Sequence, residues 1–337
     1  MGLKAWANTN GTVWATSNGT IVTSLVDADN PEGIRPYTVR FKFDDTSYNP
    51  TNESWASGSF WVQVTSEPNV WDFTYVNSSW IRIFDGRFQN RQNLVHILGA
   101  NLLGVNAVGI AFRDCTALRS VSTMDLSTAT SMDSLFSGCT AVTSITGLNT
   151  ASTTDTTYMF RGCTSLTTVP LFDTSNVTRM LGMFDGCTSL TTVPLFNTAN
   201  TTDMTSMLYG CTSLTTVPLF NTAKAISMTD MFRDCTSLTT VPLFNTATVT
   251  DMKNMFSNCS SLTAVPLYNT INATNVEHMF FYCRSVESGA LSLYQQMASQ
   301  VIVPETHSGC FTNCGIETVT GLADLEQIPT SWGGRMA

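Results

Sequence analysis

The sequence predicts an α/β repeat solenoid, built from 24-residue coils that each hold a short helix and a short strand, with a small β-rich domain before it. The string CTSLTTVPLFNT occurs three times unchanged, starting at Cys187, Cys211 and Cys235. Eight cysteines, from Cys115 to Cys283, follow one another at intervals of 24 residues. One coil cannot bury its apolar stripe alone, so neighbouring coils must stack.

Residues 1–81 differ in kind from the repeats. The stretches RPYTVRFKF, SGSFWVQV and VWDFTYV are rich in β-branched and aromatic residues, and turn-forming residues separate the first two. We therefore predict a β-rich domain over residues 1–81, which attaches the chain to a partner.

Residues 82–288 form the predicted solenoid, and a short helix is expected before each cysteine. Met180, Met183, Phe184 and Cys187 lie at positions i, i+3, i+4 and i+7, which is one face of a helix. Thr178 precedes this stripe by two residues, where a helix N-cap is expected.

The second half of each coil is predicted to be a short extended segment that ends in a corner. After the cysteine, apolar residues recur at every third position, for example Leu190, Val193 and Phe196. Pro194 lacks an N–H, so any strand must be short or irregular. Ten residues after each cysteine, from Asp125 to Asn269, stands an Asn or Asp that can bond the backbone of a turn and stack between coils.

The period also defines the ends of the array. Extrapolation back from Cys115 puts Arg91 in the cysteine position, so the first coil starts near residue 82. Six residues around Arg91 fit the pattern: Phe84, Phe88, Leu94, Ile97, Ala100 and Asn101.

Residues 289–337 are predicted to be a helical insertion followed by a C-terminal cap. The segment SGALSLYQQMASQ has a helical pattern, and Phe311 and Cys314 restore the spacing of the repeat after it. We expect Trp332 to cover the last coil.

The evenly spaced cysteines predict a buried column of reduced thiols rather than a disulfide framework. They do not predict a zinc site, because zinc ligands must converge on a point and these are strung along an axis. Cys310 and Cys314 break the period, and a bridge involving Cys310 stays open.

Composition excludes several classes of partner. Charged residues make up 12% of the chain, against about 25% in an average protein, and the net charge is −9. Without a basic block, we expect no nucleic-acid partner, and no stretch reaches the ~20 apolar residues of a membrane span. The first residues lack the apolar core of a signal peptide, so either this export route is not used or a leader was removed.

No pattern of residues predicts chemistry. His96, His278 and His307 share no spacing and no repeated carboxylate partner. Phosphate-binding loops, dinucleotide fingerprints and nucleophile elbows are missing from the sequence. We expect no cofactor, no metal and no enzymatic activity.

Two columns of residues are candidates for contact with a partner. One is a column of leucines that follow the proline of each coil: Leu171, Leu195, Leu219, Leu243 and Leu267. Thr123 and Gly147 hold this position in earlier coils, so the leucines form either an exposed apolar ridge or, turned inward by the backbone, part of the core. The other column stands two residues before each cysteine and varies: Arg161, Asp185, Tyr209, Arg233, Ser257 and Phe281. Variable chemistry at a fixed geometry suits either a recognition surface or a neutral solvent face.

The string NTATVTDMKNMFSNCSSLTAVPLYNT resembles the BspA-like leucine-rich-repeat family, and the match recurs from about Phe84 to Cys283. This resemblance implies a leucine-rich-repeat-like solenoid, and it implies surface exposure and adhesion. The flanking segments RPYTVRFKFDDTSYNPT, NVWDFTY, SGALSLYQQMASQ and LEQIPTSWGG are similar to those that bracket such repeats in structural proteins of gut Bacteroidales phages.

We therefore predict a non-enzymatic phage virion structural protein, such as a fibre, decoration or tail-associated protein. Its N-terminal domain would bind other virion proteins, and its solenoid would contact neighbours or a host-surface protein or glycan, as part of an oligomer or larger assembly. The alternative is a bacterial cell-surface BspA-like adhesin that binds a glycan or receptor.

Overall fold

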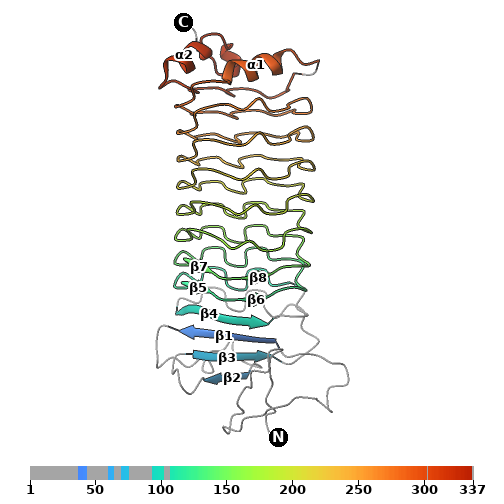
Figure 1. Ribbon diagram of the computed structural model, residues 1–337, viewed down its shortest axis with the longest axis vertical. Coiled ribbons are helices and arrows are strands. Elements are labelled where there is room, and N and C mark those ends of the chain that lie inside the picture. Colours follow the sequence, from blue (N-terminus) through green and yellow to red (C-terminus); the bar gives the residue numbers. More distant parts are fainter. Residues whose placement is uncertain are drawn as a thin grey trace.

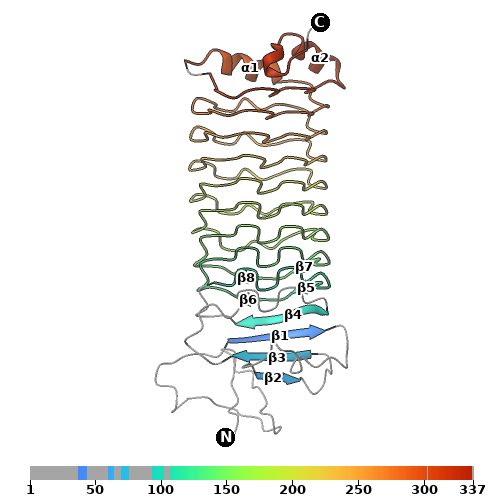
Figure 2. The ribbon, with the colours of Figure 1, turned by 180° about the vertical axis from the view of Figure 1, so that it is seen from behind.

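The chain forms a tall stack of coils in a computed structural model that describes residues 37–43, 60–63, 70–75, 93–101, 107–301 and 303–335. Four strands lie at one end of the stack and two helices close the other (Figure 1). The reverse view shows the same order, with one coil above the next along the whole length (Figure 2).

Three strands lie in the stretches before residue 81 that the sequence predicts to be β-rich. They are β1 (Tyr37–Phe43), β2 (Phe60–Gln63) and β3 (Val70–Tyr75), paired antiparallel in the order β2-β3-β1. The next strand, β4 (Leu94–Asn101), pairs antiparallel with β1, so these strands and the first coils share one sheet. The boundaries predicted at residues 81 and 288 stay predictions.

Strand β4 sets the register of the coils. It pairs in parallel with β5 (Ser120–Val121) and β6 (Met124–Asp125), which pair in turn with β7 (Ser144–Ile145) and β8 (Leu148–Asn149). Ile97 lies opposite Val121 and Asn101 opposite Asp125, each 24 residues apart. The predicted register of the first coil is thus confirmed, whereas Phe84, Phe88 and Arg91 lie outside the described residues.

The helix predicted before each cysteine is wrong. In residues 180–187, every second N–H donates a hydrogen bond to the next coil: Gly182 donates to the carbonyl of Thr205 at 2.9 Å and Phe184 to that of Met207 at 2.9 Å. The N–H groups between them close tight turns, as Asp185 does onto the Gly182 carbonyl at 3.0 Å. The segment is therefore two consecutive turns, and stacking supplies the bonds that a helix would make within itself.

These turns need left-handed backbone at two positions in each coil, five residues and one residue before the cysteine. Gly182 (φ +56°) and Gly186 (φ +72°) hold them in one coil, and Asp230 and Asp234 in another. We call these turn segments of six adjacent coils the turn wall. Its segments are residues 155–162, 179–186, 203–210, 227–234, 251–258 and 275–282.

Thr178 is not a helix cap, as the sequence predicted, but part of a ladder between coils. Its N–H and its hydroxyl both donate to the carbonyl of Thr154, 24 residues earlier, at 2.9 Å and 3.3 Å.

The predicted extended segment forms strands only where proline is missing. In the coils of Cys115 and Cys139, Ser122 and Thr146 stand in the proline position, and their N–H groups donate to the preceding coil at 2.7 and 3.0 Å. From Pro170 onward the proline supplies no N–H at this position, and the extended half of each coil forms no regular strand. We call this surface the Leu wall; it comprises residues 166–174, 190–198, 214–222, 238–246 and 262–270.

The corner predicted after the Leu wall is confirmed. The Asn197 carboxamide oxygen accepts the Ala199 N–H at 3.2 Å, which closes a turn inside the coil. The neighbouring Thr198 is buried, and its hydroxyl donates to the Asn221 carbonyl of the next coil at 2.9 Å.

The core between the two walls consists of stacked side chains. Phe112, Phe136, Phe160 and Phe184 stack at centroid distances of 5.5–5.8 Å. All ten cysteines are buried and none forms a disulfide, as predicted for the column, so Cys310 makes no bridge. The Cys211 thiol, for example, donates to the Phe184 carbonyl at 3.3 Å.

Helices cover the C-terminal end of the stack, in the part of the chain where the sequence predicts a helical insertion and a cap. Helix α1 (Ala290–Ala298) lies over the last coil, where Gln296 donates from Nε2 to the Tyr268 carbonyl at 2.6 Å in place of a further coil. Helix α2 (Val319–Leu325) and the 3-10 helix η3 (Thr330–Trp332) follow. Trp332 is buried, and its carbonyl accepts the Phe311 N–H at 2.8 Å.

Candidate interaction surfaces

The two walls face away from each other across the core. Phe184 from the turn wall and Phe196 from the Leu wall stack between them, with ring centroids 6.1 Å apart. Residues that point outward beside these rings, such as Asp185 and Leu195, therefore belong to opposite faces of the solenoid.

The leucine column is exposed, which decides between the two alternatives left by the sequence. Its members are 53–67% exposed: Leu171, Leu195, Leu219, Leu243 and Leu267. The cause is local, because Val193 and Phe196 both point into the core and the Phe196 N–H folds back onto the Pro194 carbonyl at 2.9 Å. This turn leaves Leu195 pointing to solvent.

The Leu wall is almost free of charge. Asp173 is the one charged residue in its five segments, whereas every segment of the turn wall carries at least one. The exposed positions around the leucines are filled by threonine pairs such as Thr191 and Thr192. Some of these hydroxyls are used in the stack, since Thr191 donates to the Thr167 carbonyl at 3.2 Å.

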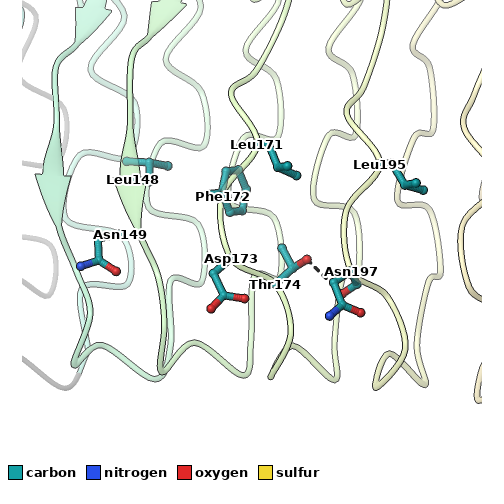
Figure 3. Close-up of a pocket in the computed structure, with 8 residues that line it drawn as sticks. All are labelled: Leu148, Asn149, Leu171, Phe172, Asp173, Thr174, Leu195 and Asn197. Atoms are coloured by element: carbon teal, nitrogen blue, oxygen red, sulfur yellow. Dashed lines mark hydrogen bonds between the residues drawn. The ribbon is translucent and has the colours of Figure 1, made fainter.

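A shallow open hollow lies where the row of leucines ends (Figure 3). It is lined by residues of three coils: Leu148, Asn149, Leu171, Phe172, Asp173, Thr174, Leu195 and Asn197. Leu171 and Leu195 project side by side from the ribbon, while Gly147 has no side chain to continue their row. The hollow can accept an apolar side chain, but its polar edge consists of an ordinary corner, where Thr174 donates to the Asn197 carbonyl at 3.0 Å.

The variable column of the turn wall is paired along the solenoid axis. Arg161 contacts the carboxylate of Asp185 in the next coil at 2.9 Å, and its guanidinium lies 5.0 Å from the centre of the Tyr158 ring. Burial raises the pKa of the Asp185 carboxyl, and the Arg161 charge opposes this shift in part. The positive charge of Arg161 in one coil is thus compensated by the negative charge of Asp185 in the next coil.

The same holds for Tyr209 and Arg233. The Arg233 guanidinium lies 5.6 Å from the centre of the Tyr209 ring and contacts Asp230 at 3.2 Å and Asp234 at 3.7 Å. Burial raises the pKa of the Tyr209 hydroxyl, and its hydrogen bond to Asp234 adds to the effect. Phe281 packs against His278 and Tyr282, with centroids 4.9 and 4.4 Å apart.

The structure does not bring the variable column together as one site. Ser257 is buried, and the other members are exposed or half-buried in small clusters of neighbouring coils. Their contact with a partner stays a prediction.

A neighbouring column at the start of each turn segment is structural, which the sequence did not reveal. The Asp203 carboxylate accepts the Thr205 N–H at 3.0 Å, and the Asp251 carboxylate accepts the Lys253 N–H at 2.9 Å. The signal was the recurrence of Asp, Ser and Asn at one position, because these residue types close such turns. Arg179 is the exception and contacts Asp155 at 3.6 Å instead.

The histidines lie apart from one another. His96 bonds the Ser120 hydroxyl at 2.6 Å, and burial, with Lys42 and Arg119 nearby, lowers its pKa. His278 packs on Phe281, and His307 stacks on Trp332 at 4.1 Å. Within the described ranges, no group of three His, Cys, Asp or Glu side chains could hold a metal ion. In that part of the chain, no helix has the length and apolar character needed to cross a membrane.

Comparison with known proteins finds one family model and one solved structure that are similar to this chain. The family model described as "Mycoplasma protein of unknown function, DUF285" matches residues 106–218 and 191–294. A solved leucine-rich repeat protein from Eubacterium ventriosum is 16% identical, with a TM-score of 0.30, over 65% of this chain and 83% of that one. No match is found among curated proteins.

Proposed function

The chain belongs to the DUF285 family of BspA-like repeats, and on this premise we propose that it is a non-enzymatic structural protein that binds other proteins through the Leu wall of its solenoid. The observation that carries the proposal is the row of five exposed leucines on an almost uncharged wall. Contiguous exposed apolar patches larger than a few hundred Å² are rare on monomeric proteins and commonly mark interaction sites.

The need to stack coils does not account for these leucines. Thr123 and Gly147 occupy the same position in coils that stack in the same register. The side chains at this position point to solvent, so stability of the core leaves their identity free. Contact with an apolar partner surface gives a reason for leucine in five consecutive coils.

We place the protein in a phage virion, where residues 1–81 bind other virion proteins and the solenoid contacts neighbours or the host surface. The motivation for this setting is the resemblance, in sequence alone, of its flanking segments to those of phage structural proteins. A bacterial cell surface is the alternative, supported by the repeat family, whose members are often surface proteins.

Mass spectrometry of purified virus particles and of the cell-surface fraction from one culture separates the two settings. The virion setting predicts the chain in particles at a fixed ratio to the other structural proteins. Recovery from the cell surface alone would contradict it.

Hydroxyl-radical footprinting tests the Leu wall in either setting. We expect Leu219 to be protected in the assembled state relative to the free chain diluted until it is monomeric, whereas Ile226, which is 54% exposed outside the Leu wall, stays equally reactive. Equal modification of Leu219 in both states would refute the proposed docking surface.

A second candidate function is glycan or receptor binding through the turn wall. It is favoured by the half-exposed aromatic and cationic pair of Tyr209 and Arg233, because such groups stack on sugars and bond their hydroxyls. A glycan array with Tyr209→Ala and Arg233→Ala should show reduced binding, with Lys224→Ala, an exposed cation outside both walls, as the control. Unchanged binding in both variants would remove this face from consideration.

A further inference from the structure

The charge on the Leu wall bears on what can cover it. The chain carries a net charge of −9, so two copies repel each other unless they meet on a surface with little charge. The Leu wall holds one charged residue, Asp173, in five segments. The turn wall, in contrast, carries charges in all six of its segments, among them Asp203, Asp234 and Glu277.

The Leu wall supplies more than half of a typical homodimer interface. With a coil spacing of about 4.8 Å and a wall about six residues wide, its five segments present roughly 480 Å². A standard interface buries about 800 Å² on each partner. The leucines lie near the middle of this area and the polar corner residues at its edge, which is the usual order of apolar centre and polar rim.

The repeat makes the wall complementary to itself. Its five leucines recur at one position per coil, so the row on one copy matches the row on another at the same spacing. A closed dimer places the same patch on both copies about a two-fold axis. Leu219 is the third of the five, so with full overlap of the rows it lies on that axis and faces its own copy, whether the solenoids run parallel or antiparallel.

From these observations we infer that the partner on the Leu wall is a second copy of this chain, joined in a two-fold dimer centred on Leu219. The inference rests on the proposed function, because it names the partner for the same docking surface. Each copy has one such wall, so the association ends at two copies and does not grow into a filament.

Sedimentation analysis of the full chain tests the dimer. We expect the wild type to dimerise at micromolar concentration and Leu219→Glu, which sets two like charges face to face, to weaken dimerisation by about 100-fold or more. The matched control is Ile226→Glu, which adds the same charge at an equally exposed aliphatic residue outside the Leu wall and should leave the dimer unchanged. Circular dichroism checks that both variants fold.

Cross-linking gives a second readout. Packed walls lie about 10 Å apart, too far for a direct disulfide, so a short bismaleimide is the suitable reagent. Because all ten native thiols are buried, only the introduced thiol should react. We expect a covalent dimer from Leu219→Cys and none from Ile226→Cys.

Three results would overturn the dimer: a monomeric wild type throughout the concentration range, equal dissociation by Leu219→Glu and Ile226→Glu, or equal cross-linking at both positions. A monomeric wild type whose Leu219 is still protected in the assembled state would remove the second copy and keep the proposed function. Unprotected Leu219 would remove the proposed function itself.

Discussion

Replacement of Gly210 by alanine distinguishes the turn wall from the helix that the apolar spacing predicts. Gly210 precedes the central Cys211 and has φ +66°, a conformation that L-residues avoid. A Cβ at this position would meet the Gly186 Cα at 3.7 Å, which is an ordinary contact. The substitution therefore changes the backbone preference without a steric clash.

The two structures predict opposite signs. In a helix, Gly→Ala stabilises by up to about 1 kcal/mol. In the left-handed turn, alanine costs about 1 to 2 kcal/mol, so the melting temperature should fall by roughly 2 to 6 °C for a protein of this size. The cost arises in the backbone alone, because the Gly210 N–H keeps its bond to the Arg233 carbonyl at 2.8 Å.

Thermal and urea unfolding, followed by circular dichroism, measure the change. Gly210→Asn is the matched control, since Asn258 occupies the same position in another coil with φ +62°. We expect the asparagine variant to lose much less stability than the alanine variant. A melting temperature for Gly210→Ala at or above that of the wild type would refute the assignment of left-handed turns.

Three further predictions concern the core, the thiols and one ion pair. Phe232→Ala should lower the free energy of unfolding by about 3 to 5 kcal/mol, because it removes a buried ring from a stack with Phe256 at 5.3 Å; in urea titrations Phe232→Leu should cost far less, since Leu208 fills the same position one coil earlier. Burial raises the pKa of Cys235 to about 12, so a thiol-specific chromogenic reagent should find no reactive thiol in the native chain and ten after denaturation. Lys253, 2.6 Å from Glu277, lowers the pKa of that carboxyl by a hydrogen bond; NMR titration of Lys253→Met should show the pKa rise. The stability lost in Lys253→Met, at most about 1 kcal/mol, should be present above the ordinary pKa of a glutamate and vanish as pH falls through the lowered value.

Much of the fold followed from one covalent fact, the 24-residue period. The period predicts that each position stacks on its own copy, and from this come the register of β4, the Asn197 corner and the buried thiols. The period fails after Cys283, but the repeat's spacing of Phe311 and Cys314 still predicts that Phe311 rejoins the stack, and Phe311 stacks on Phe280 at 6.0 Å with the rings 2° from parallel.

The local conformation before the cysteine did not follow from the apolar spacing. Positions i, i+3, i+4 and i+7 face one way in a helix, but they also face one way in two consecutive four-residue turns. The decisive signal lay in the residue before each cysteine of the column: apart from Tyr282 in the last coil, it is glycine in four coils, such as Gly186, and Asp or Asn in three. These residue types tolerate left-handed backbone, whereas glycine at a fixed helical position would cost stability in every coil.

Whether the leucine side chains point to the core or to solvent could not be predicted from the spacing of apolar residues, because it depends on the backbone bend at the preceding proline. Proline at the preceding position removes the strand bond that Ser122 and Thr146 make, and the chain then folds back through the Phe196 N–H. Whether this bend turns the next residue inward or outward is set by which neighbour fills the core. Val193 and Phe196 fill it, so the leucine between them is exposed.

The nearly constant half of the repeat, after the cysteine, and the variable half, before it, are therefore subject to different constraints. The sequence of the turn wall varies because its charged side chains pair with those of the adjacent coil. A substitution in one coil can therefore be offset by a substitution in the next, as Arg161 and Asp185 show. Most of the fixed half is held by stacking, since Val193, Phe196 and Thr198 touch their own counterparts or the core. Leu195 and its equivalents make no such contribution, yet they recur without change in five coils. Stacking explains buried positions only, so the uniformity of these exposed leucines points to a constraint outside the single chain, which is what an interface between chains supplies.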